Sequence, residues 1–389
     1  MKRFFTLFFA ILLCLVLLAV TIPTISIYLK TPMLLSGYSS LFETQFTTQL
    51  VLASVVLVVM CYLFFRLAIH GRKLLLFNLL VSILFCIGQV VFLLIMLATA
   101  NKYEATISVS QSLKGPEKSM KSTETYTYLT IYNEKQLLNV YRPKTSSTKP
   151  SIPVICVHGG AFIEGNRTQV GYAAAWFTER GYTVFSIDYP LAKFNRQTWQ
   201  SAANSVATAM RFVVKNTLQF NIDPNRFLLV GGSAGAALVM QTDLGLREGY
   251  VKAYDSVQPP ILAGVIAIYP PVSLSELWQK MEAGKTVDLH DPARKYLGGS
   301  PLQFPQRYRQ VNLIDHLSKG ISLTLIVAGA IDHVVNVEAT RTFVQKATDL
   351  KLPVSYVEVP YGEHVFDGNA HSIAGQIEWQ KISDYLKRN

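Results

Sequence analysis

A glycine-flanked serine lies between two segments with opposite structural preferences. Residues 227–230 are a short apolar run of the kind that forms a buried strand, and residues 236–240 are small and apolar, which suits a helix. The sequence between them, Gly-Gly-Ser-Ala-Gly at 231–235, predicts a sharp strand-to-helix turn. Such a turn holds Ser233 at strained backbone angles, admits only very small neighbours, and projects the hydroxyl from the strand end. The alternative is a glycine-rich turn without chemistry.

Strand and helix patterns alternate through the C-terminal two thirds of the chain. The expected strands are 126–132, 136–141, 152–157, 183–187, 227–230, 262–269, 322–327 and 354–359, and the expected helices are 171–180, 199–218, 337–350 and 373–386. This alternation predicts a mostly parallel, doubly wound α/β sheet in a domain covering residues 122–389. Prolines and glycines weaken the pattern between 272 and 319, which we expect to be a partly helical cap insertion over the strand ends.

The N-terminal hundred residues have a different composition from the rest. Three apolar runs, 4–22, 48–69 and 74–98, approach or exceed the roughly 20 residues that a helix needs to cross a bilayer. We therefore expect a transmembrane region at 1–100 and a polar linker at 101–121. The first run could instead be a signal peptide, but its apolar core is long and residues 19–21 make a poor cleavage site. An uncleaved first helix is the preferred interpretation.

Charge in the N-terminal region predicts an orientation. Its basic residues are Lys2, Arg3, Lys30, Arg66, Arg72 and Lys73, and its single acidic residue is Glu43. Positive charge stays on the cytoplasmic side, so the N-terminus and the connection at 70–73 are expected inside and the α/β domain outside. The net charge of +11 includes no basic run interleaved with aromatic residues, so a nucleic-acid partner is not expected.

A second glycine-containing loop follows the expected strand at 152–157. His158 is followed by Gly159 and Gly160, and tandem glycines at a strand end let backbone N–H groups approach a ligand closely. Acyl transfer needs such fixed donors around a tetrahedral oxyanion. His158 is expected to support this loop by hydrogen bonding. A plain turn is the alternative, and the serine turn that follows later in the chain makes it less attractive.

A nucleophilic serine needs a base and a residue that orients the base. Asp332 and His364 each follow an expected strand, and the chain order Ser233, Asp332, His364 is the one known for hydrolases with a strand–serine–helix turn. Asp315 is a rival for Asp332, but no clear strand precedes it. Of the other histidines, His158 is expected to support its own loop, and His333 adjoins Asp332 but would point away from it. The rest lie at a membrane edge, in the expected cap or its flank, or at the start of the last helix: His70, His290, His316 and His371.

These motifs resemble the hormone-sensitive-lipase-like and acetyl-esterase branch of the α/β-hydrolases over about residues 120–389. The residues that carry the resemblance are His158-Gly159-Gly160-Ala161-Phe162, Gly231-Gly232-Ser233-Ala234-Gly235, Gly329 with Asp332, and His364. The resemblance implies an α/β-hydrolase fold, a catalytic triad of Ser233, Asp332 and His364, and oxyanion-hole amides from Gly159, Gly160 and Ala234. The family often has Arg at Pro190, Asp at Gly232 and Gly at Ala161, and these departures weaken assignment to one subgroup.

The expected activity is hydrolysis of short to medium carboxylic esters through an acyl-enzyme by a membrane-anchored serine hydrolase. A small-molecule, lipid or glycan ester at the cell envelope is the expected substrate. A peptidase, amidase or formamidase-like activity on the same fold and an inactive binding module remain open. No cofactor or metal motif is present, Cys156 is expected to be a buried strand thiol, and the sequence leaves the oligomeric state open.

Overall fold

The computed structural model describes residues 2–28, 33–117, 119–143, 149–255, 257, 259–260 and 262–388. Lys30, one of the basic residues in the first connection, lies outside the described residues. The chain divides into two compact units. One unit combines Met1–Pro116 with two later segments, Gly329–His333 and Glu358–Asp384. The other contains Glu117–Ala328, Val334–Val357 and Tyr385–Asn389.

Within the described residues, eight strands form one sheet in the order β1-β2-β4-β3-β5-β6-β7-β8. Their bounds are β1 Glu124–Ile131, β2 Glu134–Tyr141, β3 Pro153–Val157, β4 Thr183–Ile187, β5 Phe227–Gly232, β6 Leu262–Ile268, β7 Thr324–Gly329 and β8 Val354–Val359. Strand β2 is antiparallel to β1 and β4, whereas β4, β3, β5, β6 and β7 pair in parallel. The mostly parallel sheet predicted from the sequence is confirmed.

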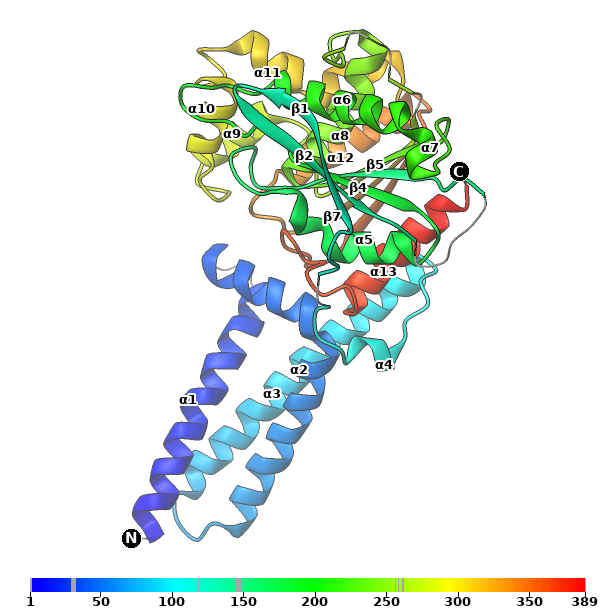
Figure 1. The fold of residues 1–389 in the computed structure, drawn as a ribbon. Helices are drawn as coiled ribbons and strands as arrows, with labels where there is room; N and C mark the ends of the chain where they lie inside the picture. Colours follow the sequence, from blue (N-terminus) through cyan, green and yellow to red (C-terminus); the bar gives the residue numbers. More distant parts are fainter. Residues whose placement is uncertain are drawn as a thin grey trace. The chain divides into compact units, whose positions relative to one another are not determined.

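The second unit surrounds its strands with helices. These are α5 Gly171–Thr178, α6 Ser201–Lys215, α7 Thr217–Phe220, α8 Ala234–Glu248, α9 Leu274–Glu282, α10 His290–Leu297, α11 Pro305–Val311 and α12 Val337–Asp349, with 3₁₀ segments η1 Arg167–Val170 and η2 Leu313–Lys319. Helices α6 and α8 lie on one face of the sheet and α5 lies on the other (Figure 1). The stripe of Val206, Met210 and Val213 on α6 is fully buried in the core, as its helical spacing predicts.

Helices α9, α10 and α11 occupy the segment between β6 and β7 that was expected to be a cap insertion. Their large apolar side chains are buried in the main core cluster of the second unit. These side chains are Leu274, Leu277, Trp278, Met281, Tyr296 and Leu297. Packing therefore accounts for the apolar surface of this segment.

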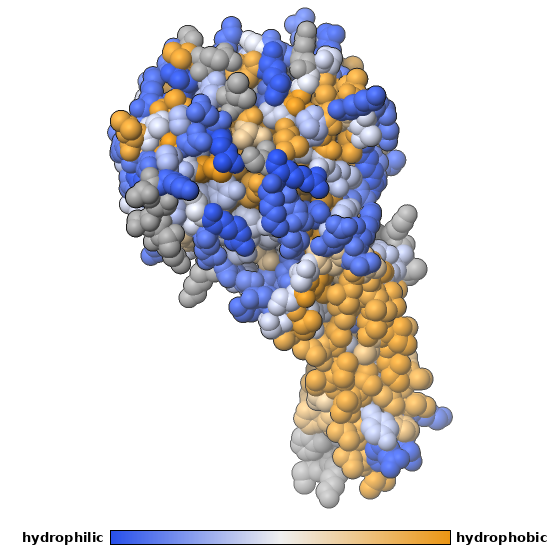
Figure 2. Space-filling view, turned by 90° about the vertical axis from the view of Figure 1, so that its right-hand side faces the viewer, coloured by the Kyte–Doolittle hydropathy of each residue, from blue (hydrophilic) through white to orange (hydrophobic). Residues whose placement is uncertain are grey.

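The first unit contains the long apolar helices. They are α1 Lys2–Tyr28, α2 Met33–Leu67 and α3 Arg72–Lys102, followed by the short α4 Val109–Ser112 and, late in the chain, α13 Ile373–Leu386. Among the described residues, the segments Thr6–Tyr28, Ser36–Leu67 and Arg72–Lys102 are long and apolar enough to cross a membrane. Apolar side chains cover the exposed surface of these helices (Figure 2). Contiguous exposed apolar surface of this extent is rare on soluble monomeric proteins.

All three helices extend beyond the apolar runs that the sequence suggested, α3 by only a few residues at each end. Helix α1 continues through Pro23 to Tyr28. Helix α2 begins fifteen residues before the expected start at 48, and its backbone leaves helical geometry at Phe46, with φ −129° and ψ 23°. The segment before Phe46 contains many polar residues, so its helical nature was hidden from a search for apolar runs. Most of its polar side chains are buried inside the unit.

Candidate active site

The turn at Ser233 has the strained geometry that the sequence predicts. Ser233 follows β5 with φ 54° and ψ −124°, and α8 begins at the next residue. A Cβ atom on Gly231 would lie 2.4 Å from the backbone carbon of Gly235, and one on Gly235 would lie 2.1 Å from the Val157 carbonyl oxygen. Neither position has space for a side chain. Such strain persists only where the surrounding structure enforces it, so the turn holds Ser233 in one backbone conformation.

The His158–Gly160 loop lies directly against this turn. A Cβ atom on Gly159 would come within 3.2 Å of the Gly232 carbonyl oxygen and 3.3 Å of the Ser233 Cβ. Gly160 has a φ of 109° and would place a Cβ 2.1 Å from the Glu164 carbonyl oxygen. Glycine is therefore required at 160. At 159, the lack of a side chain lets the backbone lie next to Ser233. Ala234, the first residue of α8, adds an amide at the positive end of the helix.

His158 and Tyr189 stabilise this loop through hydrogen bonds to its backbone carbonyl oxygens. The Nδ1–H of His158 donates to the Gly159 carbonyl oxygen at 2.7 Å, and the Tyr189 hydroxyl donates to the His158 carbonyl oxygen at 3.2 Å. The two rings stack with centroids 4.3 Å apart. Burial lowers the pKa of His158, although the Gly159 carbonyl and the charge of Asp188 act in the opposite direction. A neutral imidazole has one N–H donor, and with its proton on Nδ1 it satisfies this hydrogen bond to the Gly159 carbonyl.

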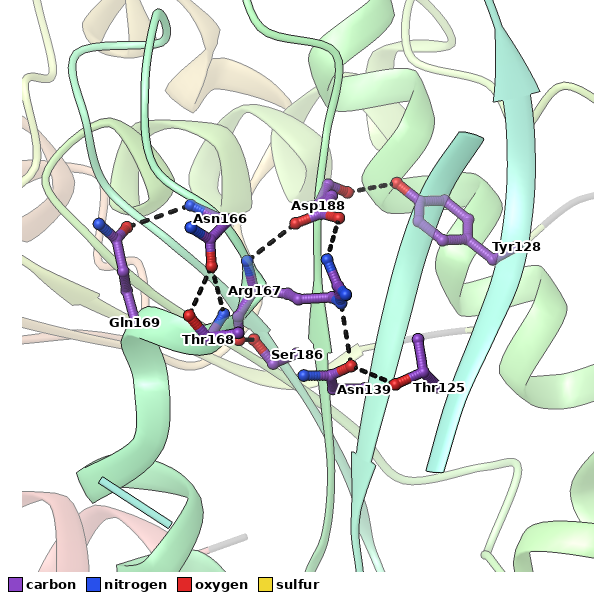
Figure 3. A network of polar contacts seen from close by, with 9 residues as sticks. All are labelled: Thr125, Tyr128, Asn139, Asn166, Arg167, Thr168, Gln169, Ser186 and Asp188. Atoms are coloured by element: carbon purple, nitrogen blue, oxygen red, sulfur yellow. Dashed lines mark hydrogen bonds and ion pairs between the residues drawn. The ribbon is translucent and has the colours of Figure 1, made fainter. Parts of the chain in front are cut away.

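A charged network fixes the strand end that carries Tyr189. Arg167 donates from its backbone N–H and its Nη1 to the two carboxylate oxygens of Asp188, at 2.8 and 2.7 Å (Figure 3). Its Nε donates to Asn139 Oδ1 at 2.9 Å, and Ser186 donates to its carbonyl oxygen at 2.6 Å. The Arg that the related family often has at position 190 is absent, and Arg167 was not among the residues predicted from the sequence. Its sequence signal was an arginine in the loop after the tandem glycines, together with an aspartate directly after a strand.

The oxyanion-loop candidate also contacts the helices between β6 and β7. The ring of Phe162 stacks on the ring of Tyr296 from α10, with centroids 3.9 Å apart and planes 12° from parallel. Both side chains are almost completely buried. The Tyr296 hydroxyl donates to Gln241 Oε1 on α8 at 3.3 Å. The loop, α10 and α8 are thus linked through one tyrosine.

Asp332 and His364 are paired within the first unit. The Nδ1–H of His364 donates to Asp332 Oδ2 at 2.8 Å. Their loops are tied together because the Ile331 N–H donates to the Gly362 carbonyl at 3.1 Å. A Cβ on Gly329 would lie 2.2 Å from that same Gly362 oxygen, so the close approach needs glycine. The hydrogen bond at Nδ1 leaves Nε2 as the ring nitrogen that accepts a proton.

Glu363, the residue before His364, links the two loops and was not among the residues predicted from the sequence. Its Oε1 accepts the His364 N–H at 2.9 Å and the His333 N–H at 2.6 Å, and its Oε2 accepts from the His333 ring. One buried carboxylate therefore bridges the loop that carries Asp332 and the loop that carries His364. An acidic residue beside a candidate base was the only sequence signal for this function.

Asp315, the sequence rival for Asp332, accepts a hydrogen bond from Asn312, the residue before η2. His333 pairs with Glu363, next to the loops of Asp332 and His364. Cys156 is buried in β3, and burial raises the pKa of its thiol to about 12, which makes it a poor nucleophile. Across the described residues, no group of three or more His, Cys, Asp or Glu side chains could hold a metal ion.

Comparisons with known proteins agree with this architecture. The BD-FAE family model matches residues 138–347. The chain is 28% identical over 251 residues to esterase LipC of Mycobacterium tuberculosis, covering 60% of this chain and 57% of that protein. It is 25% identical to the probable carboxylic ester hydrolase LipM of the same organism, covering 61% of this chain and 54% of that protein. The chain thus spans little more than half the length of these curated relatives.

The fold is shared with solved esterase structures. The propionate-bound esterase Est2 of Thermogutta terrifontis aligns with a TM-score of 0.56 and 20% sequence identity, covering 68% of this chain and 93% of that chain. At this identity the likeness concerns the fold, and the predicted α/β-hydrolase fold is confirmed. Because the BD-FAE family model matches more than half of the residues, this protein belongs to the BD-FAE family, with an α/β-hydrolase domain after three long apolar helices.

Proposed function

We propose that this protein is a membrane-anchored carboxylic ester hydrolase that uses Ser233, His364 and Asp332 as its catalytic triad. The observation that carries the proposal is the strained backbone of Ser233 at the end of β5, with the Gly159 backbone against it. Asp332 and His364 follow β7 and β8 in the same sheet and form their own hydrogen bond. In an open α/β sheet, the carboxyl ends of parallel strands are where ligands bind.

The proposed reaction begins with attack by Ser233 Oγ on the carbonyl carbon of the ester. His364 Nε2 takes the hydroxyl proton and then delivers it to the departing alcohol oxygen, which leaves an acyl-enzyme. Water attacks the acyl-enzyme and gives its proton to His364, the carboxylic acid departs, and Ser233 recovers its proton. Asp332 holds the ring tautomer and stabilises the transient imidazolium.

The backbone amides at 159, 160 and 234 are proposed to stabilise the negative oxygen of both tetrahedral intermediates. Donors that are fixed before the reaction need no reorganisation when charge develops, and one such donor lowers the barrier by about 3 kcal/mol in well-studied cases. The glycines that bring this loop against Ser233 support the assignment. His158 is proposed to support the loop without touching the substrate, through its bond to the Gly159 carbonyl.

A preference for short acyl groups is part of the proposal. The large apolar side chains between β6 and β7 are packed in the core, which leaves less apolar surface for a long acyl chain. The curated relatives are named as esterases, and Est2 has structures with propionate and butyrate. We expect acetyl to hexanoyl esters to react faster than palmitoyl esters, on a small-molecule, lipid or glycan alcohol.

Ser233→Ala in the full-length protein tests the proposal. The expected result is complete loss of p-nitrophenyl butyrate hydrolysis and of covalent labelling by a fluorophosphonate, with an unchanged melting temperature. A variant that keeps more than a few per cent of activity would remove Ser233 from the mechanism. Faster turnover of matched amides than of esters would favour the amidase alternative, and an unlabelled wild type would favour an inactive binding module.

The proposed location is the membrane, with the α/β-hydrolase domain outside the cytoplasm. This orientation follows from the basic residues near the N-terminus and at 72–73, which the positive-inside rule places on the cytoplasmic side of the membrane. Protease added to intact cells or spheroplasts is expected to cleave beyond residue 101. Full protection of that region, with cleavage after permeabilisation, would reverse the orientation.

A further inference from the structure

The first part of α2 has its polar side chains inside the protein. The buried positions follow helical spacing and are Ser36, Ser39, Ser40, Glu43, Thr44 and Thr47. On the same helical segment, Tyr38 and Phe42 are 75% and 55% exposed. This is the reverse of an ordinary surface helix, in which the apolar stripe is buried. A buried polar stripe requires polar partners, because unpaired polar groups are costly inside a protein.

Part of this stripe is bonded to the loop that carries His364. The hydroxyl of Ser40 donates to the carbonyl oxygen of Tyr361, three residues before the histidine. The side-chain amide of Gln45 donates to the carbonyl oxygen of Val365, one residue after the histidine, at 3.2 Å. In return, Asn369 Nδ2 donates to the Gln45 carbonyl at 2.9 Å. The loop is thus held by α2 on both sides of His364.

Gly37 gives the Glu363 carboxylate its place beside α2. A Cβ atom on Gly37 would lie 3.0 Å from Glu363 Oε2 and 3.6 Å from His333 Nδ1. The helix backbone therefore approaches the carboxylate that accepts the His364 and His333 backbone N–H groups. A larger residue at 37 would push against the atoms that tie the Asp332 loop to the His364 loop.

The other two long helices contact the same loop through one aromatic ring. Tyr361 lies with its ring centroid 5.6 Å from that of Tyr28 on α1 and 5.8 Å from that of Phe92 on α3. Phe92 is fully buried. Aromatic pairs at this separation contribute about 0.5–1.5 kcal/mol beyond the burial of their surface. All three long helices therefore fix the segment that precedes His364.

We propose that the N-terminal helices are a positioning element of the active site, with Ser40 and Gln45 of α2 setting the place of the His364 loop. This inference rests on the proposed function, in which His364 is the general base. A helix bundle that served only as an anchor would not need hydrogen bonds to the loop that carries the base. Here the bundle and the base loop share side-chain hydrogen bonds on both sides of the histidine.

Loss of these bonds should act on catalysis more than on substrate binding. The base must meet the Ser233 proton within hydrogen-bond reach, and a displacement of about 1 Å in such geometry can cost on the order of 100-fold in rate. Ser40 and Gln45 bond to backbone atoms of the loop, so their removal shifts the base without changing its chemistry. The expected pattern is a lower kcat with a nearly constant KM.

The test uses the full-length protein in detergent or lipid nanodiscs with p-nitrophenyl butyrate and a fluorophosphonate. The double variant Ser40→Ala/Gln45→Ala is expected to lower kcat and the fluorophosphonate labelling rate by about 10-fold or more, with KM within about twofold. The matched control is Ser54→Ala/Gln49→Ala on the same helix. There Ser54 donates to Val51 in its own helix and Gln49 donates to Lys114 in the linker.

Further variants separate positioning from folding. Ser40→Thr keeps the hydroxyl and is expected to retain more than half of kcat, whereas Ser40→Ala is not. If the double variant does not fold, Gln45→Ala alone replaces it, because that side chain is only half-buried. Equal kcat in the Ser40/Gln45 variants and the control, or equal losses in both, would overturn the inference. A wild type that is not labelled on Ser233 would instead overturn the proposed function.

Discussion

Asp332 Oδ2 lies 2.8 Å from His364 Nδ1, and the two side chains are only 2% and 11% exposed. A carboxylate shielded in this way holds the imidazole in the tautomer with a free Nε2. In Asp332→Asn the amide can donate to Nδ1 and favour the wrong tautomer, so we expect kcat for ester hydrolysis to fall by about 10⁴-fold with little change in KM. Steady-state kinetics on the purified protein measure this.

Asp315→Asn is the control for that experiment. Asp315 accepts a hydrogen bond from Asn312, the residue before η2, and was the sequence rival for the orienting residue. Its substitution is expected to change kcat by less than about twofold. If the two substitutions had equal effects, Asp332 would have no special part in catalysis.

Gly231 and Gly232, which precede Ser233, differ in the space available for a side chain. A Cβ on Gly231 would meet backbone atoms at 2.4 Å, whereas one on Gly232 would meet only the Tyr269 side chain, at 3.4 Å. Gly231→Ala is therefore expected to destabilise the protein by at least about 1–3 kcal/mol, and Gly232→Ala by less than about 1 kcal/mol. Thermal unfolding of both variants in detergent checks the difference, and similar melting temperatures would contradict the steric argument.

The strand–turn–helix at Ser233 was predictable because every requirement lies within about fifteen residues. The apolar strand, the small flanking residues and the helix-compatible run are all local. The same holds for α6, where the period of Val206, Met210 and Val213 alone indicates the buried face. Local periodicity also gave the strands that precede Asp332 and His364, so their pairing could be anticipated from chain order.

The helix before Phe46 was missed because its partners are remote in the sequence. Ser40 and Gln45 look like loop residues until they are seen bonded to residues 361 and 365. Arg167 was missed for a similar reason, since its contacts are Asn139 in β2 and Asp188, the residue after β4. Polar residues that satisfy one another across the fold leave no periodic pattern in the sequence.

Arg167 is expected to contribute substantially to stability. Its ion pair with Asp188 is largely shielded, with side chains 22% and 19% exposed, and it adds a bond to Asn139. Arg167→Ala should lower the free energy of unfolding by about 2–3 kcal/mol, because Asp188 then loses its charged partner. Lys193→Ala removes the far more exposed pair with Glu134 and should cost at most about 1 kcal/mol. Denaturant unfolding that ranked the two variants in the opposite order would contradict the network of Figure 3.

His158 is expected to make stability depend on pH on the acid side. Burial lowers its pKa below the ordinary value of 6.5, while the Gly159 carbonyl and Asp188 oppose the shift. The unfolded chain therefore binds a proton more readily than the folded protein, so the stabilisation is present above about pH 6.5 and is lost as pH falls towards the folded pKa. His158→Gln should flatten the fall in melting temperature between about pH 6.5 and 5. An unchanged slope would show that His158 does not titrate with unfolding.

Glu378 on α13 should produce the opposite dependence. It is fully buried, and among the described residues neither carboxyl oxygen has a hydrogen-bond partner. Burial raises the pKa of this carboxyl well above its usual range, and the charge of Asp367 raises it further. The folded protein therefore holds the proton more tightly than the unfolded chain. Its stability is greatest below the unfolded pKa of about 4.5 and is lost as pH rises through the folded value.

Glu378→Gln replaces the carboxyl by a neutral group of the same shape and removes this penalty. The melting temperatures of variant and wild type should be close near pH 5 and should diverge by at least about 2 °C in favour of the variant near pH 8. Glu179→Gln, at an exposed position after α5, is the control and should track the wild type at both pH values. A Glu378→Gln variant that is less stable than the wild type at pH 8 would mean that the carboxylate is ionised and has a partner in the folded protein.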